Sequence, residues 1–321
     1  MTGYEDVDIA VIGAGPAGAA AAITAARQGA KVILIGPAKP DDGFEQSVGP
    51  PGIAVLERLG AGSAGRRGWF TGILGPHGPQ MFGVNQAGDA IGAHIDRRQM
   101  DAALRASARA AGARYRDSEV ARIDSAVASF CVTCRDGTRL IAARLILATG
   151  RARHLGRQLG MRSKRCSPPL LVSTGRRRID GPDAVMARFL PQPHGWLWVA
   201  PLGNGLASWT SLARAGTIAA ARLAKAGRMT AATWLLASPA GGPGWMAVGD
   251  AVCALDPSWG RGILWALTSG EAAGRYAAAR LAADIPRCRE LELQYRREIH
   301  ALAVGEVTQL AARTAGFDAR L

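Results

Sequence analysis

The sequence predicts an α/β protein in which a lobe of strands and helices is interrupted by a strand-rich lobe and followed by C-terminal helices. Three observations predict this arrangement. A strand, a glycine-rich turn, a helix and a second strand follow one another within residues 7–35. Two further α/β segments, at 95–150 and 244–285, are set apart by strand-like segments at 62–93 and 167–212. The 321 residues, 48% of them apolar, suffice for two packed lobes with a sizeable core.

Composition narrows the classes of function. The net charge is +14, and only Lys31, Lys39, Lys164 and Lys225 of the 39 basic residues are lysines. A composition rich in Ala, Gly and Arg often follows from a biased genome. The charge therefore suits an anionic cofactor or an acidic partner, and we expect no nucleic-acid binding. Five cysteines at irregular spacing argue against a disulfide framework. No signal peptide precedes the first strand and no charge-free run of about twenty apolar residues occurs, so we expect a cytoplasmic protein without a membrane span.

The strongest motif lies near the N-terminus. The run VDIAVI leads into GAGPAG at 13–18, then into an alanine-rich segment that stops at Gly29, and then into KVILI at 31–35. Strand, G-x-G-x-x-G, helix and strand in this order form the dinucleotide-binding fingerprint. Its first glycine makes the tight turn, the second admits a pyrophosphate, and the third lets helix and strand pack closely, while the helix N-terminus favours the phosphates. The predicted cofactor-binding residues of this motif are Gly13, Gly15, Pro16, Ala17 and Gly18.

One part of the fingerprint is missing. The second strand should end in an acidic residue that holds the adenosine ribose, yet VILI is followed by Gly36 and Pro37. Two alternatives stay open. Either Asp41 or Asp42 takes the place of that acid, or the contact with the ribose is weaker.

Helices elsewhere are marked by their end signals. Residues 50–60 begin with proline and end with glycine, and residues 96–111 begin at the N-cap Asp96 and are followed by glycine. Both segments are predicted helices. Further helices are predicted over 214–226 and over the tail at 287–310.

Turn signals mark the strands. Asp136-Gly137 and Asn204-Gly205 each lie between strand-like runs and predict hairpins. The Gly-rich segment 62–93 predicts short strands and loops. Cys131 and Cys134 form a CxxC pattern, but three residues apart on a strand they face opposite sides, so we interpret them as structural rather than metal-binding.

The arginine-rich segment 151–180 predicts loop and at most a short helix. Its run at 176–178 is either a solvated surface or a docking patch for an acidic partner. The α/β and strand-rich segments together divide the chain into two discontinuous units. The predicted nucleotide-binding domain comprises 1–61, 94–166 and 236–321, and the predicted substrate lobe comprises 62–93 and 167–235.

A set of motifs adds a family resemblance. With GAGPAG, DRRQMD, LILATGR and GDAVCALDPSWGRGILWAL in this order, residues 7–285 resemble the FAD-dependent aromatic hydroxylase superfamily, which includes flavin-dependent halogenases and polyprenyl reductases. The segments PPGIAVLERLG, HIDRRQMDAAL, ATGRARHLGRQLG, GWLWVAPLGNG and WMAVGDAVCALDPSWGRGI look most like the flavoproteins that mature the tryptophylquinone cofactor of lysine and glycine oxidases. The resemblance implies FAD as cofactor, a Rossmann-like FAD-binding domain and an inserted β-rich substrate lobe.

The resemblance also implies where FAD lies. Asp250 would hydrogen-bond a ribitol hydroxyl, and Asp256-Pro257 would run beside the isoalloxazine. The following helix start would favour negative charge on the reduced flavin by roughly 0.3–1 kcal/mol. Arg97 or Arg98 would reach the pyrophosphate. The remaining cofactor-binding residues implied are Gly150, Gly249, Pro257, Gly260, Gly262 and Ile263.

Two details concern the reacting group. Trp259 stands where the superfamily often has a smaller residue, so it either lines the flavin and substrate or packs in the core. The run Trp196-Leu197-Trp198-Val199-Ala200-Pro201 nearly repeats the W-x-W-x-I-P motif of the halogenases. Halogenases also need a lysine before the helix at 96, and none lies between Lys39 and Lys164. Halogenation is therefore not expected.

Three functions remain. The first is an FAD-dependent monooxygenase acting on an aromatic group, either a small molecule or a tryptophan side chain of a partner protein or peptide. The second is a flavin reductase or dehydrogenase of a small apolar molecule, and the third is a non-catalytic flavoprotein maturation scaffold. His94 and His194 are candidate bases because both flank segments expected at the lobe interface. Because no second nucleotide fingerprint exists, electrons would come from transiently bound NAD(P)H or from a separate reductase. No metal site is predicted.

Overall fold

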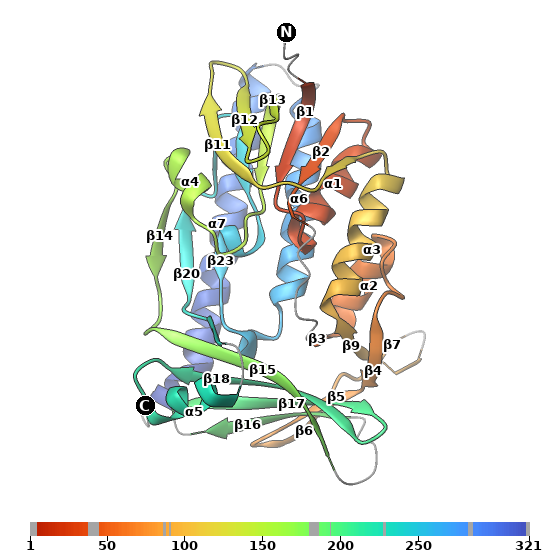
Figure 1. Cartoon of the computed structure of the whole chain (residues 1–321), viewed down its shortest axis with the longest axis vertical. Coiled ribbons are helices and arrows are strands. Elements are labelled where there is room, and N and C mark those ends of the chain that lie inside the picture. Colours follow the sequence, from red (N-terminus) through yellow and green to blue (C-terminus); the bar gives the residue numbers. More distant parts are fainter. Residues whose placement is uncertain are drawn as a thin grey trace.

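The computed structural model describes residues 5–37, 45–85, 88–89, 91–179, 186–192, 194–226, 229–281 and 285–318. Asp41 and Asp42, the candidate ribose acids, lie outside the described residues. The elements form two halves stacked along the long axis of the molecule (Figure 1). The upper half carries the N-terminal motif, and a large sheet forms the floor of the lower half.

The upper half is built on a parallel sheet. Its strands run in the order β10 (Arg114–Arg116), β2 (Val32–Ile35), β1 (Glu5–Ile12), β13 (Arg139–Leu147) and β22 (Trp245–Ala247). The strand VILI is buried at every position because helices or loops cover both faces of a parallel sheet. The alternation of strand and crossover predicted from the N-terminal motif is confirmed.

An antiparallel extension continues the sheet beyond β13. There β12 (Phe130–Cys134) and β11 (Val120–Ser125) pair in sequence. The predicted hairpin turn at Asp136-Gly137 is confirmed, and Gly137 has the positive φ of 84° that such turns need. Cys134 is buried and Cys131 is half-buried on the other side, as the strand period predicts.

Small residues let the helices of this half pack closely. The helices are α1 (Pro16–Arg27), α2 (Pro50–Arg58), α3 (Arg97–Ala110) and α6 (Gly262–Ala279). A Cβ on Gly270 of α6 would lie 2.2 Å from the Ala17 carbonyl oxygen, so α1 and α6 touch backbone to backbone. The predicted N-cap of α3 is confirmed, because the Asp96 carboxylate accepts from the backbone N–H groups of Arg98 and Gln99.

A seven-stranded sheet forms the lower half (Figure 1). Its order is β19 (Met229–Ala231), β15 (Leu170–Arg178), β18 (Leu206–Arg214), β17 (Gly195–Gly203), β16 (Met186–Gln192), β5 (Gly72–Gly75) and β6 (Gly78–Met81). The hairpin predicted at Asn204-Gly205 joins β17 to β18. The segment 151–180 contains one short helix, α4 (His154–Gln158), as predicted, but the prediction of loop for the rest was wrong, because β14 (Arg162–Arg165) and β15 also lie there.

Smaller sheets join the two halves. One has the order β3 (Glu45–Val48), β9 (Gly92–Asp96) and β4 (Arg66–Phe70), and another has the order β14, β20 (Leu235–Ser238) and β23 (Cys253–Ala254). Besides β23, further two-residue strands are β7 (Val84–Asn85), β8 (Gly88–Asp89) and β21 (Gly241–Gly242). Two single turns of 3₁₀ helix, η1 (Gly249–Ala251) and η2 (Pro257–Trp259), precede α6.

The last two helices differ in length from their predictions. Helix α5 (Ile218–Ala226) starts four residues later than the predicted 214–226, because β18 continues to Arg214. Helix α7 (Ile285–Asp318) is longer than the predicted 287–310 at both ends and runs the height of the molecule (Figure 1). None of the helices in the described ranges combines the length and apolarity that a membrane crossing requires.

Candidate functional site

The turn between β1 and α1 needs glycine at two positions of the fingerprint. Gly13 has φ +113°, and a Cβ there would lie 2.0 Å from the Ala148 carbonyl oxygen. A Cβ on Gly18 would lie 1.8 Å from the Gly13 carbonyl oxygen. Both contacts are far inside van der Waals distance, so Gly13 and Gly18 are required by the fold itself.

Gly15 differs from these two glycines. A Cβ there would meet only Arg97 Nη2, at 3.9 Å, within the described part of the chain. Gly15 is also the N-cap of α1 and offers no side chain to the first helical N–H groups, and Pro16 follows at the first turn. Open space, unpartnered helix N–H groups and a guanidinium therefore meet at one point. This combination fits the pyrophosphate of FAD.

The structure distinguishes the two predicted phosphate arginines. Arg97 lies beside Gly15, and its Nε is 2.9 Å and 3.0 Å from the two carboxylate oxygens of Asp101, which hold the side chain in place. Arg98 is exposed and contacts Asp96 through its backbone N–H. Of the two arginines, Arg97 is the one that lies at the phosphate loop, and its contact with a pyrophosphate stays a prediction.

The Gly249-Asp250 turn is clamped next to the phosphate loop. A Cβ on Gly249 would lie 2.9 Å from Ala17 Cβ, and the positive φ of 58° at Gly249 also favours glycine. Its N–H donates to Ser269 Oγ of α6 at 3.0 Å. Asp250 thus leaves the end of β22 between the starts of α1 and α6, where the carboxyl ends of parallel strands present ligand-binding groups.

The surroundings of Asp250 are strongly basic. Arg151 Nε lies 3.7 Å from Asp250 Oδ2. The side chain keeps 41% of its surface accessible, yet protein atoms enclose the turn, and this burial raises the pKa of Asp250 while Arg151, Arg97 and Arg153 act to lower it. Three guanidiniums around one carboxylate leave a net positive charge, which favours an anionic cofactor.

Arg151 is a site residue that the sequence did not single out. Its Nη1 donates to the Thr233 carbonyl oxygen at 2.8 Å and its Nη2 to the Leu255 carbonyl oxygen at 2.9 Å. It follows Gly150, which has φ 62°, and a Cβ added to Gly150 would meet no described atom within 4 Å. The signal was the place of Arg151 just after a parallel strand, at the edge where ligand-binding groups gather.

The segment before α6 is held by Asp256. Its carboxylate accepts from the Ser258 backbone N–H at 2.8 Å and from Trp234 Nε1 at 2.5 Å, and burial raises its pKa. The segment beyond it is open. Of the predicted cofactor-binding residues in this segment, Pro257, Gly260 and Gly262 are exposed and Ile263 is half-buried.

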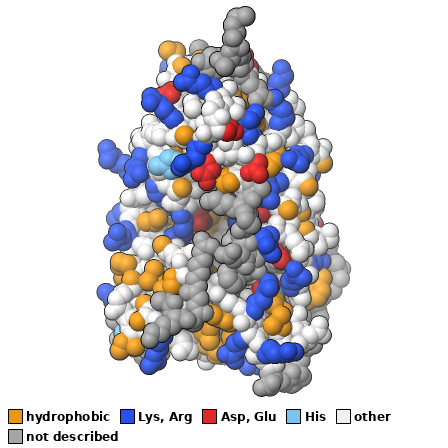
Figure 2. All heavy atoms as spheres, in the orientation of Figure 1, with side chains coloured by type: hydrophobic (Ala, Val, Ile, Leu, Met, Phe, Trp, Pro, Cys, Tyr) orange, Lys and Arg blue, Asp and Glu red, His pale blue; other side chains and the backbone are white. Residues whose placement is uncertain are grey.

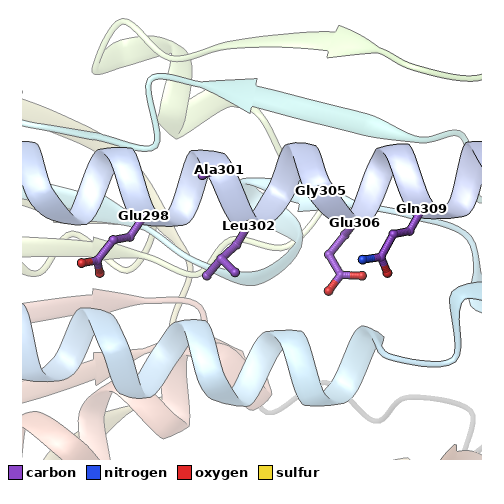
Figure 3. A pocket seen from close by; sticks show the side chains of 6 residues that line it. All are labelled: Glu298, Ala301, Leu302, Gly305, Glu306 and Gln309. Atoms are coloured by element: carbon purple, nitrogen blue, oxygen red, sulfur yellow. The ribbon is translucent and has the colours of Figure 1, made fainter.

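Trp259 is anchored to the C-terminal helix. Its Nε1 donates to Glu306 Oε2 of α7 at 2.7 Å, and its ring packs at 54° against Trp265 with centroids 6.3 Å apart. Glu306 also lines a groove of about 520 Å³ along α7. Figure 3 shows Glu298, Leu302 and Glu306 pointing to the same side of that helix. These contacts give Trp259 a packing role, and a role at the flavin stays a prediction.

His94 belongs to a buried network that links the halves. Ser47 Oγ lies 2.9 Å from His94 Nδ1 and accepts from Trp198 Nε1 of the large sheet at 3.0 Å. Phe70 stacks on the imidazole with centroids 4.5 Å apart. His94 Nε2 is buried without a hydrogen-bond partner among the described residues. Burial lowers the pKa of His94 to about 4, so the ring is neutral at physiological pH.

This pKa predicts a pH-dependent stability. Between pH 6.5 and about 4, His94 binds a proton in the unfolded chain but not in the folded protein. The contribution of neutral His94 to the free energy of unfolding is therefore fully present above pH 6.5 and is lost as the pH falls toward 4. The maximal effect is about 3 kcal/mol. Denaturant unfolding at pH 7 and pH 4.5 should show a larger loss for the wild type than for His94→Gln. Equal losses would contradict the burial of a neutral His94.

His194 is not brought to His94. It has φ 65° at the turn before β17, and its carbonyl oxygen accepts from the Arg214 backbone N–H at 3.0 Å. Trp198 lies four residues further along β17, which places His194 about 13 Å from the network along the strand. The two candidate bases therefore do not form one constellation.

The absence of an acidic residue at position 36 has a steric explanation. A Cβ on Gly36 would lie 2.5 Å from the Ala14 backbone nitrogen, so this backbone admits only glycine. The Gly36 carbonyl oxygen accepts from Tyr115 Oη of β10 at 2.9 Å. The phosphate loop thus packs directly on the end of β2, and a side-chain contact with the ribose from residue 36 is absent.

Comparisons with known proteins agree with this geometry. A family model for pyridine nucleotide-disulphide oxidoreductases matches residues 7–167, half of the chain. The menaquinone reductase of Mycobacterium tuberculosis is 28% identical over 344 residues, covering 91% of this chain and 79% of that protein. Among solved structures, CmlS, a flavin-dependent halogenase, has a TM-score of 0.77 at 18% identity over 95% of this chain and 64% of its own.

A second solved structure is also similar. QhpG, a peptidyl tryptophan dihydroxylase essential for tryptophylquinone cofactor biogenesis, has a TM-score of 0.72 at 23% identity over 94% of this chain and 73% of its own. The flavin-dependent halogenase and this dihydroxylase share the fold of the chain, which agrees with the Rossmann-like FAD-binding fold that the sequence motifs imply. The chain belongs to the pyridine nucleotide-disulphide oxidoreductase family and is an FAD-dependent oxidoreductase.

Proposed function

We propose that this oxidoreductase is a monooxygenase that acts on an aromatic group, a tryptophan side chain of a partner protein or peptide. The observation that carries the proposal is a row of aromatic side chains, Phe189, Trp196 and Trp198, on the large sheet, which we call the aromatic wall. Its Trp198 side chain points toward the FAD half. Trp198 Nε1 donates a hydrogen bond to Ser47 Oγ of the FAD half, so the wall and the cofactor-binding half are in direct contact there.

Strand register identifies the members of the wall. Residues directly opposite one another on neighbouring strands share a face of the sheet. Phe189 lies opposite Trp198, and Trp198 lies opposite Thr210. Trp196, two residues from Trp198, shares its face and packs in a buried cluster with Val172 and Leu212. An apolar, aromatic surface of this kind suits an aromatic ring better than a charged substrate.

We propose roles for the residues around this wall. FAD, when bound, supplies the redox and oxygen chemistry. Asp250 and Arg97 hold the cofactor, Trp196 and Trp198 orient the substrate ring and exclude water, and His94 positions Trp198 through Ser47. Because the pKa of His94 is about 4, this imidazole stores a proton poorly and serves as a neutral hydrogen-bonding group.

The resemblance to QhpG supports the choice of substrate. QhpG acts on a peptidyl tryptophan, and its coverage of 94% of this chain includes both halves. We propose the same discontinuous division as the sequence predicts, with 62–93 and 167–235 as the substrate lobe. Reduced nicotinamide or a separate reductase would supply the electrons.

A second candidate function rests on the curated relatives. A menaquinone reductase is 28% identical to this chain over 91% of its length, which favours reduction of an apolar quinone without oxygen. The aromatic wall also accommodates such a ring. The two functions therefore differ in their need for dioxygen rather than in the shape of the site.

Isotope labelling tests the proposal. FAD-loaded protein is incubated with NADPH and isotopically heavy dioxygen, with N-acetyl-tryptophanamide or a tryptophan-containing peptide as probe. We expect heavy oxygen in the indole product by mass spectrometry, and a Trp198→Ala variant that keeps its FAD should lose at least about tenfold in kcat/KM. Anaerobic reduction of a menaquinone with no oxygen incorporation would instead establish the reductase. Neither reaction from an FAD-loaded protein would favour a maturation scaffold.

A further inference from the structure

We infer that the pocket lined by Arg67, Arg176 and Arg178 binds the phosphate of the reduced pyridine dinucleotide that donates electrons, and selects NADPH over NADH. The inference rests on the proposed function in one respect, the need for a reduced nicotinamide donor. The pocket has a volume of about 550 Å³, within the range of about 300–1,000 Å³ typical of small-molecule sites.

Buried carboxylates fix two of these arginines. Arg176 makes a bidentate pair with Glu45, with Nε at 3.2 Å and Nη2 at 2.5 Å from the carboxylate oxygens. Arg67 Nη2 lies 2.9 Å from Asp96 Oδ2. The carboxylates are 2–3% exposed, whereas the two arginine side chains are 45% and 46% exposed. The acids therefore orient the guanidiniums from below, and the guanidiniums face solvent.

Arg178 supplies the uncompensated charge. It lies two residues from Arg176 on β15, hence on the same face of the sheet, and it is exposed. No ion pair joins it to any residue of the described ranges. Among the residues that the structure describes, two carboxylates face three guanidiniums at this polar pocket, which leaves a net positive charge. Guanidiniums bind phosphate through paired N–H donors, so a phosphate group is the complementary ligand.

The position of the pocket points to the electron donor. Asp96, which holds Arg67, is also the N-cap of α3, and the next residue is Arg97 beside the phosphate loop. The pocket therefore borders the proposed FAD site. A dinucleotide whose nicotinamide reaches the flavin has its 2′-phosphate at the other end of the molecule, and a basic pocket that borders the FAD site is one place where this end can bind.

No second helix of the described ranges begins with a fingerprint turn that could hold that phosphate. The spacing G-x-G-x-x-G recurs at 60–65, but that run follows the end of α2 and leads into strand β4 instead of a helix. It therefore lacks the strand before and the helix after that make the fingerprint a phosphate site. Side chains must hold the phosphate of the donor instead.

The hairpin between β17 and β18 forms the opposite wall. Residues 202–206 line the pocket, and Asn204 sits at the turn with φ 54°. Its amide offers a donor and an acceptor for the ribose hydroxyls or phosphate oxygens. NADPH differs from NADH by its 2′-phosphate, which adds at most two negative charges. A cationic pocket binds the form with the additional negative charge more tightly.

A matched pair of variants tests the inference. Arg177 lies between Arg176 and Arg178 on the same strand, is exposed, and points to the opposite face of the sheet. Arg177→Ala therefore removes the same net charge from the same strand outside the pocket. This control is needed because basic side chains are spread over the face drawn in Figure 2.

The measurement is the affinity of adenosine 2′,5′-bisphosphate for the FAD-loaded protein by calorimetry. We expect saturable binding that weakens with salt and that is tighter than binding of adenosine 5′-monophosphate. Arg178→Ala should weaken it at least about tenfold, with Arg177→Ala within about twofold of the wild type. In steady state, Arg178→Ala should raise the KM for NADPH while leaving the KM for NADH unchanged.

Two results would overturn the inference. One is that Arg178→Ala and Arg177→Ala weaken bisphosphate binding equally, which would mean that general surface charge accounts for the effect. The other is no preference of the wild type for the bisphosphate over the monophosphate. The visible FAD spectrum of each variant verifies folding. If the protein binds the bisphosphate but does not oxygenate an aromatic probe, the proposed function is refuted and the pocket is established. If it oxygenates the probe but does not bind the bisphosphate, the inference about the pocket is refuted and the proposed function stands.

Discussion

Gly15→Ala is expected to abolish tight FAD binding while the protein stays folded. An added Cβ meets only Arg97 Nη2, at 3.9 Å, among the described atoms, so the substitution costs the fold little. The methyl group would occupy the space at the N-terminus of α1 that fits the pyrophosphate. We expect a loss of affinity of about a hundredfold, or ~2.7 kcal/mol. FAD titration of the apoprotein measures the affinity, and thermal unfolding of the apoprotein measures the stability.

Gly18→Ala is the matched comparison, three residues along the same motif. Its Cβ would lie 1.8 Å from the Gly13 carbonyl oxygen, so α1 must move away from the sheet. We expect a loss of about 3 kcal/mol or more in the free energy of unfolding, with or without FAD. If the two variants behave alike in both measurements, the distinction between a structural and a ligand-facing glycine is wrong.

Asp250→Ala is the second substitution with a large expected effect. The carboxylate stands at the end of β22 among Arg151, Arg97 and Arg153, where we propose that it accepts a hydrogen bond from the ribitol chain. Losing a charged hydrogen bond of this kind costs about 1.5–3 kcal/mol, or roughly ten- to a hundredfold in FAD affinity. Fluorescence titration of the apoprotein with FAD measures this loss.

Asp124→Ala provides the control for charge. Asp124 pairs with Arg122 on β11, at the antiparallel edge of the sheet, and both side chains are exposed. This variant removes one carboxylate without touching the site, so its FAD affinity should match the wild type. A similar loss in both variants would mean that net charge, and not the position of Asp250, sets the affinity.

Local signals predicted the cofactor-binding half well. Gly18 is required by its contact with the Gly13 carbonyl oxygen five residues away, and Gly13 by its φ of +113° in the turn, so the pattern is readable from sequence alone. The N-cap Asp96 and the turn at Asp136-Gly137 are likewise local, because the residues that they bond lie within three positions. Such features need no knowledge of distant segments.

Long-range partners explain what the sequence did not predict. The segment Leu170–Arg178 looks like a solvated loop because it ends in three arginines, yet β18 pairs with it along its whole length, and the paired residues lie 28 to 44 positions apart in the sequence. Arg176 finds its carboxylate in Glu45, and His94 finds Trp198 through Ser47. These contacts join segments 100 residues or more apart in most cases, and a single sequence carries no signal for them.

The glycine at position 36, where the fingerprint expects an acidic residue, is explained by the sequence and the structure together. The sequence showed that the expected acid is replaced by Gly36, and the structure supplies the reason in the 2.5 Å approach to the Ala14 nitrogen. Among the described residues, we therefore propose that the binding of FAD depends on the phosphate loop and Arg97. This dependence is why the Gly15→Ala variant is expected to have so large an effect.

Reoxidation of the reduced, FAD-loaded protein tests the proposed oxygenase most directly, because it needs no knowledge of the natural substrate. The flavin is reduced anaerobically, and the recovery of its visible absorbance is followed after rapid mixing with either air-saturated buffer or an anaerobic menaquinone solution. For an oxygenase we predict fast recovery with dioxygen and none with menaquinone on the same timescale. Fast recovery with menaquinone and slow recovery with dioxygen would contradict the proposed oxygenase and identify the protein as a reductase.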